Sequence, residues 1–574
     1  MDRRFFFALL LTALVVVGTP FLFPSTRAKA PQTVAAGDSV RSPAGAQAPS
    51  GTPTVASPGA MAAAPAMRAD TSVPAAVAPA PQVIDTTAVT AGGNVYHFVN
   101  VGASPVSVRV AGYADRRPGA RDDEVQLVRA DERLLRYRFV VGPGDTIALD
   151  TVPMRAEVVR GEGAGVREVR FTGNTARGGV AITYRFEPGD STYLTTVAGR
   201  LDNAPAGSRL LVDLPRGLSS AEVDTLDDLR HLSFSYRIED RDVESFAFAK
   251  LDTARAQIDT GAISWVAVRN KYFLAALLSV DEATPFRSVR MRGAKPVSKN
   301  VVLDAQATAA MPLDQGSFAF QLYAGPQKYE RLNALGRDLV NVNPYGGWFA
   351  GMVQPFATIV MRVLLWLKQT TMLSYGWVLV IFGVLIRLAI WPLNQSAMRS
   401  SIRMQRLQPE MQAIQTKYAR DPEKLREAMM RLYADHGMSP FSPVMGCLPM
   451  LIPMPVLFAL YFVFQNTIEF RGVPFMWMPD LTLKDPFYIT PIFMGLSMLL
   501  LSWIGMRGAP QTPQTKVMGY AMPAMMTVLF LNFPSGLNLY YAVQNVVALP
   551  QQWLLSRERA KAGIGAPVLG KAKA

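Results

Sequence analysis

The sequence contains very few of the residues that build disulfide, metal and redox sites. Its 574 residues include one Cys and three His. A single Cys excludes an intramolecular disulfide and any zinc or iron–sulfur site that needs several thiolates, and three scattered His residues exclude a His-rich metal cage. The chain also lacks a G-x-x-x-x-G-K-S/T segment that could hold a nucleotide phosphate. We therefore expect no catalytic residue, no metal and no cofactor.

Hydrophobic residues and positive charge are abundant instead. Hydrophobic residues make up 50% of the chain, the mean hydropathy is +0.15 and the net charge is +14. Residues 83–343 carry 32 basic and 32 acidic side chains, whereas residues 344–574 carry 20 basic and 9 acidic ones. The excess positive charge lies between apolar segments, which indicates membrane topology signals rather than a nucleic-acid surface.

The first 82 residues predict an anchor followed by a tether. Residues 5–23 form an uncharged apolar run that is nearly long enough to span a bilayer core, so we interpret residues 1–27 as an N-terminal transmembrane signal anchor. The alternative is a signal peptide that is cleaved after Ala30. Residues 28–82 are dominated by Ala, Pro, Ser, Gly and Thr and cannot bury a core, which predicts a Pro/Ala-rich disordered linker.

Residues 83–343 predict a large antiparallel β-sandwich domain. Short alternating apolar runs recur along this region, and turn residues such as Gly189-Asp190 separate them, as is typical of sandwiches and barrels. Residues 328–340 predict a short helix that leaves the domain. We expect strands in the eight runs 96–101, 134–141, 166–171, 180–186, 193–201, 232–238, 263–268 and 318–323.

The rest of the chain predicts a polytopic α-helical membrane protein. Residues 344–373 are apolar but contain Arg362, Lys368 and several aromatic residues, so we expect an amphipathic helix that lies at the membrane interface. Residues 557–574 form a basic tail. The core, residues 374–556, has five apolar segments, which together with residues 5–23 predict six transmembrane helices. The five predicted core spans are residues 374–393, 446–465, 488–506, 517–533 and 536–555.

The basic residues of the loops predict the orientation of the chain. Segment 394–443 has eight basic residues and the C-terminal tail has five, whereas loop 466–487 has only two. The positive-inside rule therefore places segment 394–443, loop 507–516 and both termini in the cytoplasm. The β domain and loop 466–487 then lie outside, on the other side of the membrane.

Segment 394–443 predicts a basic, amphipathic helical hairpin with arms at residues 396–419 and 423–435. Apolar residues recur at i, i+3 and i+4 spacing in the first arm, and Pro422 opens the second. The hairpin is either a solvated connector or a surface that meets an incoming chain, anionic headgroups or ribosomal RNA. Its candidate surface residues are Arg399, Arg403, Arg406, Lys417 and Arg420.

Arg387 lies inside the first core span. A charge at the centre of a span costs about 3 kcal/mol, so Arg387 either faces a polar cavity or extends its side chain to the cytoplasmic interface near Pro392. The five core spans contain no Asp or Glu, which argues against an ion-coupled transporter and an intramembrane protease. Polar residues that could line a cavity crowd the last two spans: Asn532, Asn538, Tyr540, Tyr541, Gln544 and Asn545.

The C-terminal motifs resemble the YidC family of bacterial membrane protein insertases. The matching segments occur in the order GVLIRLAIWPLNQSAMRS, SPVMGCLPMLIPMPVLFALY, DPFYITPIFMGLSMLL and FPSGLNLYYAVQNVVALPQQWLL. ISWVAVRNKYFLAALL and FQLYAGPQKYERL match the periplasmic domain of the long, Gram-negative-type members more weakly. Pro453 stands where the family commonly has Gln, and an added proline alters the kink of a helix.

This resemblance implies a location, a function, partners and site residues. It implies a multi-pass protein of the bacterial inner membrane, in which the linker 28–82 and the β-sandwich domain 83–343 are periplasmic. Such insertases insert and help fold newly synthesised inner-membrane proteins, alone or with the Sec translocon and its accessory subunits, without hydrolysing nucleotide. Arg387 matches the arginine of a hydrophilic groove, and Tyr540 and Tyr541 match positions beside it. Pro449, Met454 and Leu457 match positions along which a substrate helix slides. The implied partners are nascent membrane proteins, the Sec translocon, the ribosome and the lipid bilayer, with no small-molecule substrate.

Two other classes of protein are weighed against the insertase. A carbohydrate-active enzyme needs a clustered acid–base set, usually His with a carboxylate, but His97 and His231 are isolated in sequence and we interpret both as structural. A channel or transporter is the other class, and the missing carboxylates in the spans argue against it.

Overall fold

The structure is a computed structural model in which the described residues belong to one compact unit, Ile84–Ala574. The predicted anchor (1–27) and linker (28–82) lie outside the described residues, as do most of the basic tail and the start of the predicted span 446–465. The structure describes residues 85–561, except for 121–122, 162–164, 188, 190–191, 282–283, 299–300, 344–349, 419–420, 438–453 and 508–512.

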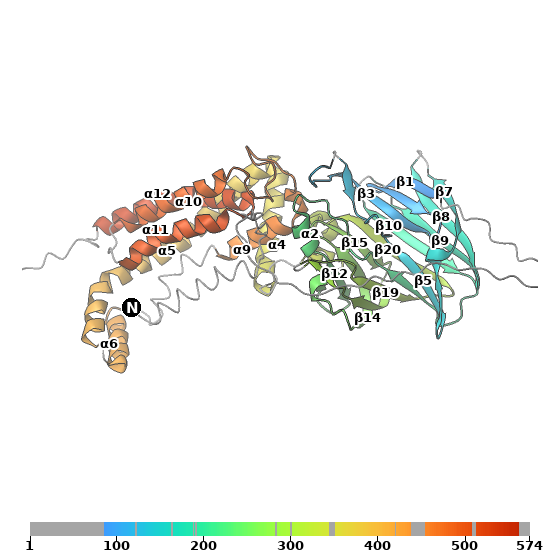
Figure 1. The fold of residues 1–574 in the computed structure, drawn as a ribbon. Coiled ribbons are helices and arrows are strands. Elements are labelled where there is room, and N and C mark those ends of the chain that lie inside the picture. Colours follow the sequence, from blue (N-terminus) through green and yellow to red (C-terminus); the bar gives the residue numbers. More distant parts are fainter. Residues whose placement is uncertain are drawn as a thin grey trace, which may run out of the picture. The chain divides into compact units, whose positions relative to one another are not determined.

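The N-terminal part of the described chain is built from antiparallel strands (Figure 1). One sheet has the order β1-β2-β3-β4, and a 14-stranded sheet has the order β6-β5-β11-β19-β16-β14-β15-β20-β10-β9-β8-β7, with β12 and β13 attached through β14. A two-stranded ribbon joins β17 and β18. The strands are β1 Thr86–Ala91, β2 Asn94–Val99, β3 Ser104–Ala114, β4 Glu124–Gln126, β5 Arg136–Gly142, β6 Asp145–Ala148, β7 Met154–Arg160, β8 Val166–Thr175, β9 Gly178–Phe186, β10 Leu194–Leu201, β11 Arg209–Asp213, β12 Ser233–Ile238, β13 Glu244–Ala247, β14 Gln257–Arg269, β15 Phe273–Ser279, β16 Phe286–Arg292, β17 Pro296–Ser298, β18 Val301–Val302, β19 Gln306–Pro312 and β20 Ser317–Pro326.

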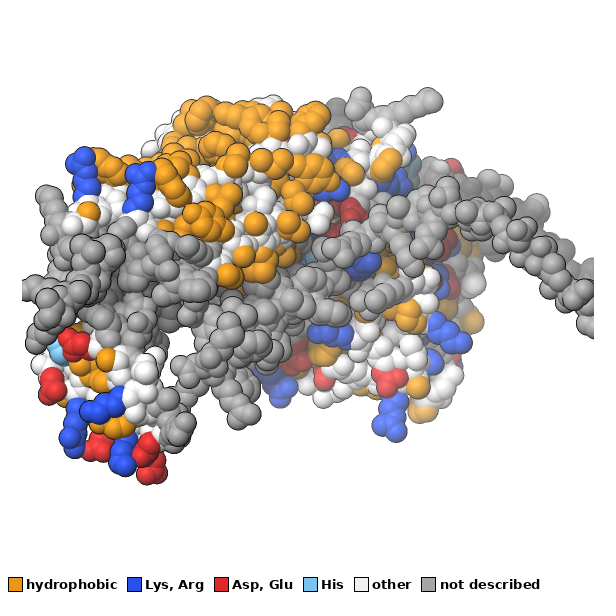
Figure 2. All heavy atoms as spheres, turned by 60° about the vertical axis from the view of Figure 1, so that its left-hand side comes forward, with side chains coloured by type: hydrophobic (Ala, Val, Ile, Leu, Met, Phe, Trp, Pro, Cys, Tyr) orange, Lys and Arg blue, Asp and Glu red, His pale blue; other side chains and the backbone are white. Residues whose placement is uncertain are grey.

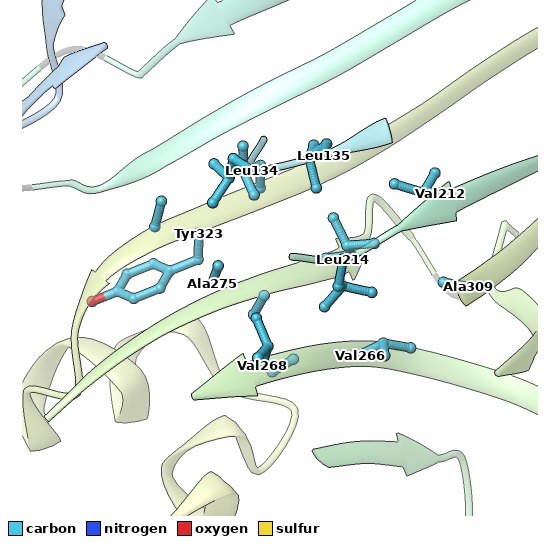
Figure 3. Close-up of a cluster of buried hydrophobic side chains, with 14 of the residues drawn as sticks. Leu134, Leu135, Val212, Leu214, Val266, Val268, Ala275, Ala309 and Tyr323 are labelled. Atoms are coloured by element: carbon cyan, nitrogen blue, oxygen red, sulfur yellow. The ribbon is translucent and has the colours of Figure 1, made fainter. Parts of the chain in front are cut away.

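Alternation along the strands builds the core of this β domain. In β5, Tyr137, Phe139 and Val141 are buried while the residues between them are partly exposed, as the two-residue period of a strand requires. The two larger sheets pack through aromatic side chains: Phe98 of β2 lies 4.7 Å from Tyr184 of β9 between ring centroids. Figure 3 shows another part of the same core, where neighbouring strands contribute buried side chains such as Val212, Val266 and Tyr323. All eight runs in which strands are expected overlap observed strands.

The C-terminal part is helical. Figure 1 shows α5, α10, α11 and α12 side by side, while α4 packs on α9. The helices are α2 Thr225–Arg230, α3 Tyr329–Leu335, α4 Ala350–Thr371, α5 Tyr375–Lys417, α6 Pro422–Asp435, α9 Met454–Asn466, α10 Ile489–Met506, α11 Pro513–Phe530 and α12 Ser535–Lys561; the short 3-10 turns are η1 Leu149–Thr151, η2 Phe248–Lys250, η3 Leu339–Val342 and η5 Ile468–Phe470.

Within the described residues, two helical segments have the length and composition to cross a membrane. These are Tyr375–Pro392 of α5 and Ile489–Met506 of α10, and the apolar segments Val456–Asn466 and Gly519–Phe530 are shorter. The count of six transmembrane helices therefore stays a prediction.

The predicted first arm of the hairpin is helical to Lys417, and it is the direct continuation of the first core segment, because α5 runs through Pro392 without a break. Its 43 residues correspond to about 65 Å of helix, roughly twice the thickness of a bilayer core. A proline removes one backbone hydrogen bond, and the residues around Pro392 are mostly helix formers, so the helix persists.

The loop between α9 and α10, residues 467–488, is bonded to the β domain. The Arg471 side chain is only 3% exposed, and its Nε donates to Oε1 of Glu222 at 2.7 Å. Its Nη2 also donates to the carbonyl oxygens of Ala114 and Ala221. Ile468, two residues past the end of α9, belongs to the buried core of the β domain. The α9–α10 loop and the β domain therefore share one set of buried contacts.

We predict that Arg471→Met lowers the free energy of unfolding by about 3–5 kcal/mol, because Glu222 then stays buried without its cation. The double variant Arg471→Met/Glu222→Met should recover most of this loss, since no unpaired charge is left. Denaturant unfolding of the full chain in detergent measures both. Arg200→Met is the matched control, because its pair with Asp202 is solvent-exposed on both sides and contributes at most about 1 kcal/mol. Equal losses for Arg471→Met and Arg200→Met would contradict the prediction.

Glu469 of the same loop bonds the start of α3. One carboxylate oxygen accepts the N–H of Tyr329, the first residue of α3, at 2.9 Å, and the other is buried without a partner among the described residues. Burial is the main cause that raises the pKa of Glu469 from 4.5 to about 7.

This shift predicts a pH dependence of stability. Between about pH 4.5 and pH 7 the folded chain binds a proton at Glu469 that the unfolded chain has lost, so stability falls as pH rises through this range. Glu469→Gln should remove this contribution, and its stability relative to the wild type should rise with pH. Unfolding curves at several pH values measure the difference, with the exposed Glu157→Gln as control. Parallel curves for the wild type and Glu469→Gln would rule the prediction out.

Candidate functional site

A polar seam lies between α5 and α12, around Arg387. Arg387 is half-buried on α5, and its Nη2 donates to Oε1 of Gln551 on α12 at 2.9 Å. Gln551 is 1% exposed, and its own amide nitrogen donates to the carbonyl oxygen of Trp391 at 3.4 Å. The guanidinium is thus hydrogen-bonded to the neighbouring helix α12, although its Nε has no partner among the described residues.

The seam continues along α12 towards its N-terminal end. The amide nitrogen of Gln544 donates to the carbonyl oxygen of Gly383 at 2.7 Å, and the Tyr540 ring lies 5.9 Å from the ring of Phe382. A Cβ at Gly383 would lie 3.0 Å from a methyl group of Val543, so the small residue permits the close approach of the helices. Residues 540, 544 and 551 follow i, i+4 and i+11 spacing and share one face of α12.

The two expected groove tyrosines face different neighbours. Tyr540 packs towards α5, whereas the Tyr541 ring lies 5.3 Å from Phe530 of α11. Their rings are 5.7 Å apart and almost perpendicular. Tyr540 therefore joins the seam with Arg387, and Tyr541 joins the contact between α11 and α12.

The structure describes only part of the expected sliding surface. Pro449 lies outside the described residues, and Met454 is the first residue of α9 but its side chain lies outside them as well. Leu457 is buried on α9, which packs mainly on α4. No described contact joins Leu457 to the seam around Arg387.

The basic residues of the cytoplasmic segment lie mostly along the extension of α5. Arg399, Arg403 and Arg406 belong to this helix, but their side chains are outside the described set, and Arg420 lies outside it entirely. Lys417 ends the helix, is exposed, and has its Nζ 5.3 Å above the Tyr418 ring. The second arm, α6, begins as expected after Asp421, whose carboxylate accepts the N–H of Lys424.

Gln551 is the seam residue that sequence reasoning missed. It lies on the same helical face as Tyr540 and Gln544, so the spacing of polar residues along 536–555 could have revealed it. Its position near the expected cytoplasmic end of the span made a solvated glutamine the simpler interpretation.

One acidic cluster in the β domain has the composition of a cation site. Oxygen atoms of Asp131, Glu132 and Asp304 come within 4.8 Å of one another. Three arginines pair with these carboxylates and supply the opposite charge: Arg129, Arg136 and Arg216. The cluster is therefore an ion-pair network. His231 is structural, since its ring nitrogen Nδ1 lies 2.8 Å from the carbonyl oxygen of Asp227 in α2.

Comparison with known proteins identifies the family. Residues 95–359 match the family model of the YidC periplasmic domain, and residues 366–562 match the 60Kd inner membrane protein model. A membrane protein insertase YidC from Oleidesulfovibrio alaskensis is 32% identical over 69% of this chain and 72% of its own length. The chain belongs to the YidC family of membrane protein insertases. Its β domain is the periplasmic domain of this inner-membrane family.

Other YidC relatives match a shorter part. The membrane protein insertase YidC from an Anaeromyxobacter species is 35% identical over 52% of each chain, so the match spans about half the length of that relative. The crystal structure of an active YidC insertase with its first transmembrane domain resolved is 20% identical and covers 82% of this chain and 94% of that chain. Its TM-score of 0.34 is too low to compare the arrangement of parts.

We predict an interaction energy of about 1 kcal/mol between Arg387 and Gln551 in a double-mutant cycle. The variants are Arg387→Met, Gln551→Leu and the pair together, measured by unfolding in lipid nanodiscs. Gln551→Leu alone should be the more harmful single change, because it leaves a half-buried guanidinium without its acceptor. Additive losses would show that the hydrogen bond does not couple the two helices. A cycle between Arg387 and Gln544 provides the control, since Gln544 bonds a backbone carbonyl instead.

Proposed function

We propose that this chain inserts newly synthesised proteins into the bacterial inner membrane and assists their folding. It would act alone or with the Sec translocon and its accessory subunits, and without nucleotide hydrolysis. Membership of the YidC family supports the general activity. The chemistry of the α5–α12 seam supports the proposed role of Arg387.

One observation carries the proposal: the positive charge of Arg387 lies in an apolar helix and is paired with a neutral amide. Gln551 accepts a hydrogen bond from the guanidinium but leaves its charge unneutralised. Among the described residues, no carboxylate has an ion pair or electrostatic interaction with Arg387 that would occupy it. An anionic or strongly hydrated group that enters the seam would therefore find a free positive charge in a low-dielectric setting.

The proposed mechanism follows from the cost of desolvation. A hydrated substrate tail must lose its water to cross the apolar layer, and a charged group at its centre costs several kcal/mol. Arg387 would offer this tail a partner part-way across, and Tyr540 and Gln544 would extend the polar path along α12. The apolar helix of the substrate would then move into lipid along α9 and α11, past Pro449, Met454 and Leu457.

The proposed topology has six transmembrane helices with both termini in the cytoplasm. The bonds between the α9–α10 loop and the periplasmic β domain support a periplasmic position for this loop. The chain changes sides of the membrane at each span. The basic extension of α5 and the helix α6 would therefore lie in the cytoplasm, where this segment would receive the nascent chain and approach the ribosome. The helix α4 would lie at the periplasmic membrane surface, since it exposes Phe356, Ile359 and Trp366 beside Arg362.

The proposal is tested by replacing the native insertase of a bacterial host with this chain. Arg387→Ala should reduce insertion of a small Sec-independent substrate with an acidic tail about tenfold, which corresponds to about 1.4 kcal/mol. Protease protection of the exported tail measures insertion, at equal abundance of each variant. Arg387→Lys should retain most of the activity because it keeps the charge.

Leu388→Ala provides the matched control, since Leu388 is the exposed neighbour on the same helix turn. Full insertion by Arg387→Ala would contradict the role of the arginine. Failure of the wild-type chain to insert any substrate, although it is folded in the membrane, would contradict the proposed function itself.

A further inference from the structure

Exposed apolar side chains gather on the turn between α4 and α5 and on the α9–α10 loop. Met372, Met476 and Phe487 are 80%, 66% and 65% exposed, which is unusual for large apolar residues outside a helix face. Together with Leu373, Trp477 and Tyr488, which are also exposed, these residues are called the apolar rim.

A ring contact and a hydrogen bond join the start of α5 to two parts of the α9–α10 loop. The ring of Phe475, next to Met476, lies 5.5 Å from the ring of Trp377 and perpendicular to it. The indole N–H of Trp477 donates to Oδ2 of Asp485 at 3.1 Å, which ties this part of the loop to the residues just before Phe487. The first turn of α5, which follows Met372 and Leu373 directly, is therefore in contact with residues 475–478, and these are bonded to residues 485–488.

One part of the α9–α10 loop has buried carboxylates beside exposed apolar side chains. Asp485 is fully buried and accepts hydrogen bonds from the N–H groups of Phe487 and Thr490 and from the Thr490 hydroxyl. Asp480 is also buried and bonds Thr482 within the loop and Arg116 of the β domain. The carboxylates of Asp480 and Asp485 are buried while the side chains of Met476, Trp477 and Phe487 are exposed. Other apolar side chains of the same loop, such as Phe475 and Met478, are buried. A loop surrounded by water would gain free energy from the opposite arrangement.

The backbone holds three rim residues in the left-handed region. Met372, Met476 and Tyr488 have φ values of 57°, 52° and 57°. Residues with a Cβ adopt this conformation rarely, and such strain persists where the surrounding structure enforces it. The buried aspartates supply this enforcement in the loop. The outward position of Met476 and Tyr488 is thus part of a rigid framework.

The rim lies at the ends of the two described helical segments that have the length and composition to cross a membrane. Tyr488 directly precedes Ile489, where the span of α10 begins, and Leu373 lies two residues before the span that starts at Tyr375. The other side of the loop is bonded to the periplasmic domain through Arg471. Aromatic and long apolar residues at such a level prefer the boundary between lipid headgroups and acyl chains.

We propose that the apolar rim inserts into the headgroup–acyl boundary of the periplasmic leaflet and forms a rigid lipid-binding platform. The α9–α10 loop then has two partners: phospholipid on the side of Met476 and Phe487, and the β domain on the side of Arg471. This arrangement sets the height of the β domain above the bilayer. The proposal depends on the membrane position of the loop and is independent of insertase activity.

Site-directed spin labelling of the full chain tests the platform. The single Cys, Cys447, is replaced by Ser, and nitroxides are attached at Met476→Cys or, separately, Phe487→Cys in liposomes of phosphatidylethanolamine and phosphatidylglycerol. Collision rates with oxygen, which concentrates in lipid, and with a water-soluble nickel chelate report the depth of each label. Leu496→Cys, on the exposed face of α10, serves as the lipid reference, and Ile258→Cys, exposed on the β domain, serves as the water reference.

Labels at 476 and 487 should collide with the nickel chelate at least about threefold less than the label at 258, and with oxygen more often than it does. Rates equal to those at 258 would overturn the proposal, because the rim would then lie in water. Protection from both reagents would overturn it as well, because a protein partner or a second copy would then cover the rim. Two label sites keep the test valid if one cysteine variant fails to fold, and insertion measured on the same variants separates this result from that of the proposed function.

Discussion

The helical part of the chain depends on the polar side chains of one helix, α12. Inside a membrane there is no water to satisfy buried polar groups, so each must find its partner within the protein. Gln544 and Gln551 bond α5, and Asn545 bonds the carbonyl oxygen of Met494 and the hydroxyl of Ser497 on α10. Asn538 bonds the carbonyl oxygen of Phe530 at the end of α11. A single helix therefore connects three others, and Arg387 belongs to the same system of bonds.

The N-terminal end of α12 extends this system to the α9–α10 loop. Ser535 is fully buried, and it bonds the carbonyl oxygens of Asp480 and Leu483 in the α9–α10 loop. The same loop is fixed to the β domain by Arg471 and Glu469. Polar contacts thus join α12 to α5 at the Arg387 seam, α12 to the α9–α10 loop at Ser535, and this loop to the β domain. Apolar packing fills the helix contacts, but these directional bonds determine which helix faces meet.

Much of the fold could be predicted from local patterns. Strand runs such as 180–186 alternate with a two-residue period, and helices such as 488–506 are long, apolar and uncharged. Each pattern therefore identifies its own element from neighbouring residues. The continuation of α5 through Pro392 could not be predicted in this way, since a proline is compatible with both a kink and an end. Gln551 was missed for a related reason: its sequence position is that of a solvated residue, and only the approach of α5 buries it.

The sequence by itself determined the class of protein, the division into a β domain and an apolar helical core, and the presence of Arg387 within a span. These properties depend on composition and on short-range periodicity, which are fully contained in neighbouring residues. Tertiary structure alone decided that Gln551 bonds Arg387, that Tyr540 and Tyr541 face different helices, and that Arg471 reaches Glu222, 249 residues away in sequence. It also decided that two aspartates of the α9–α10 loop are buried while Met476 and Phe487 are exposed. A side chain acquires such a role from the chain segments that pack around it, and these are distant in sequence.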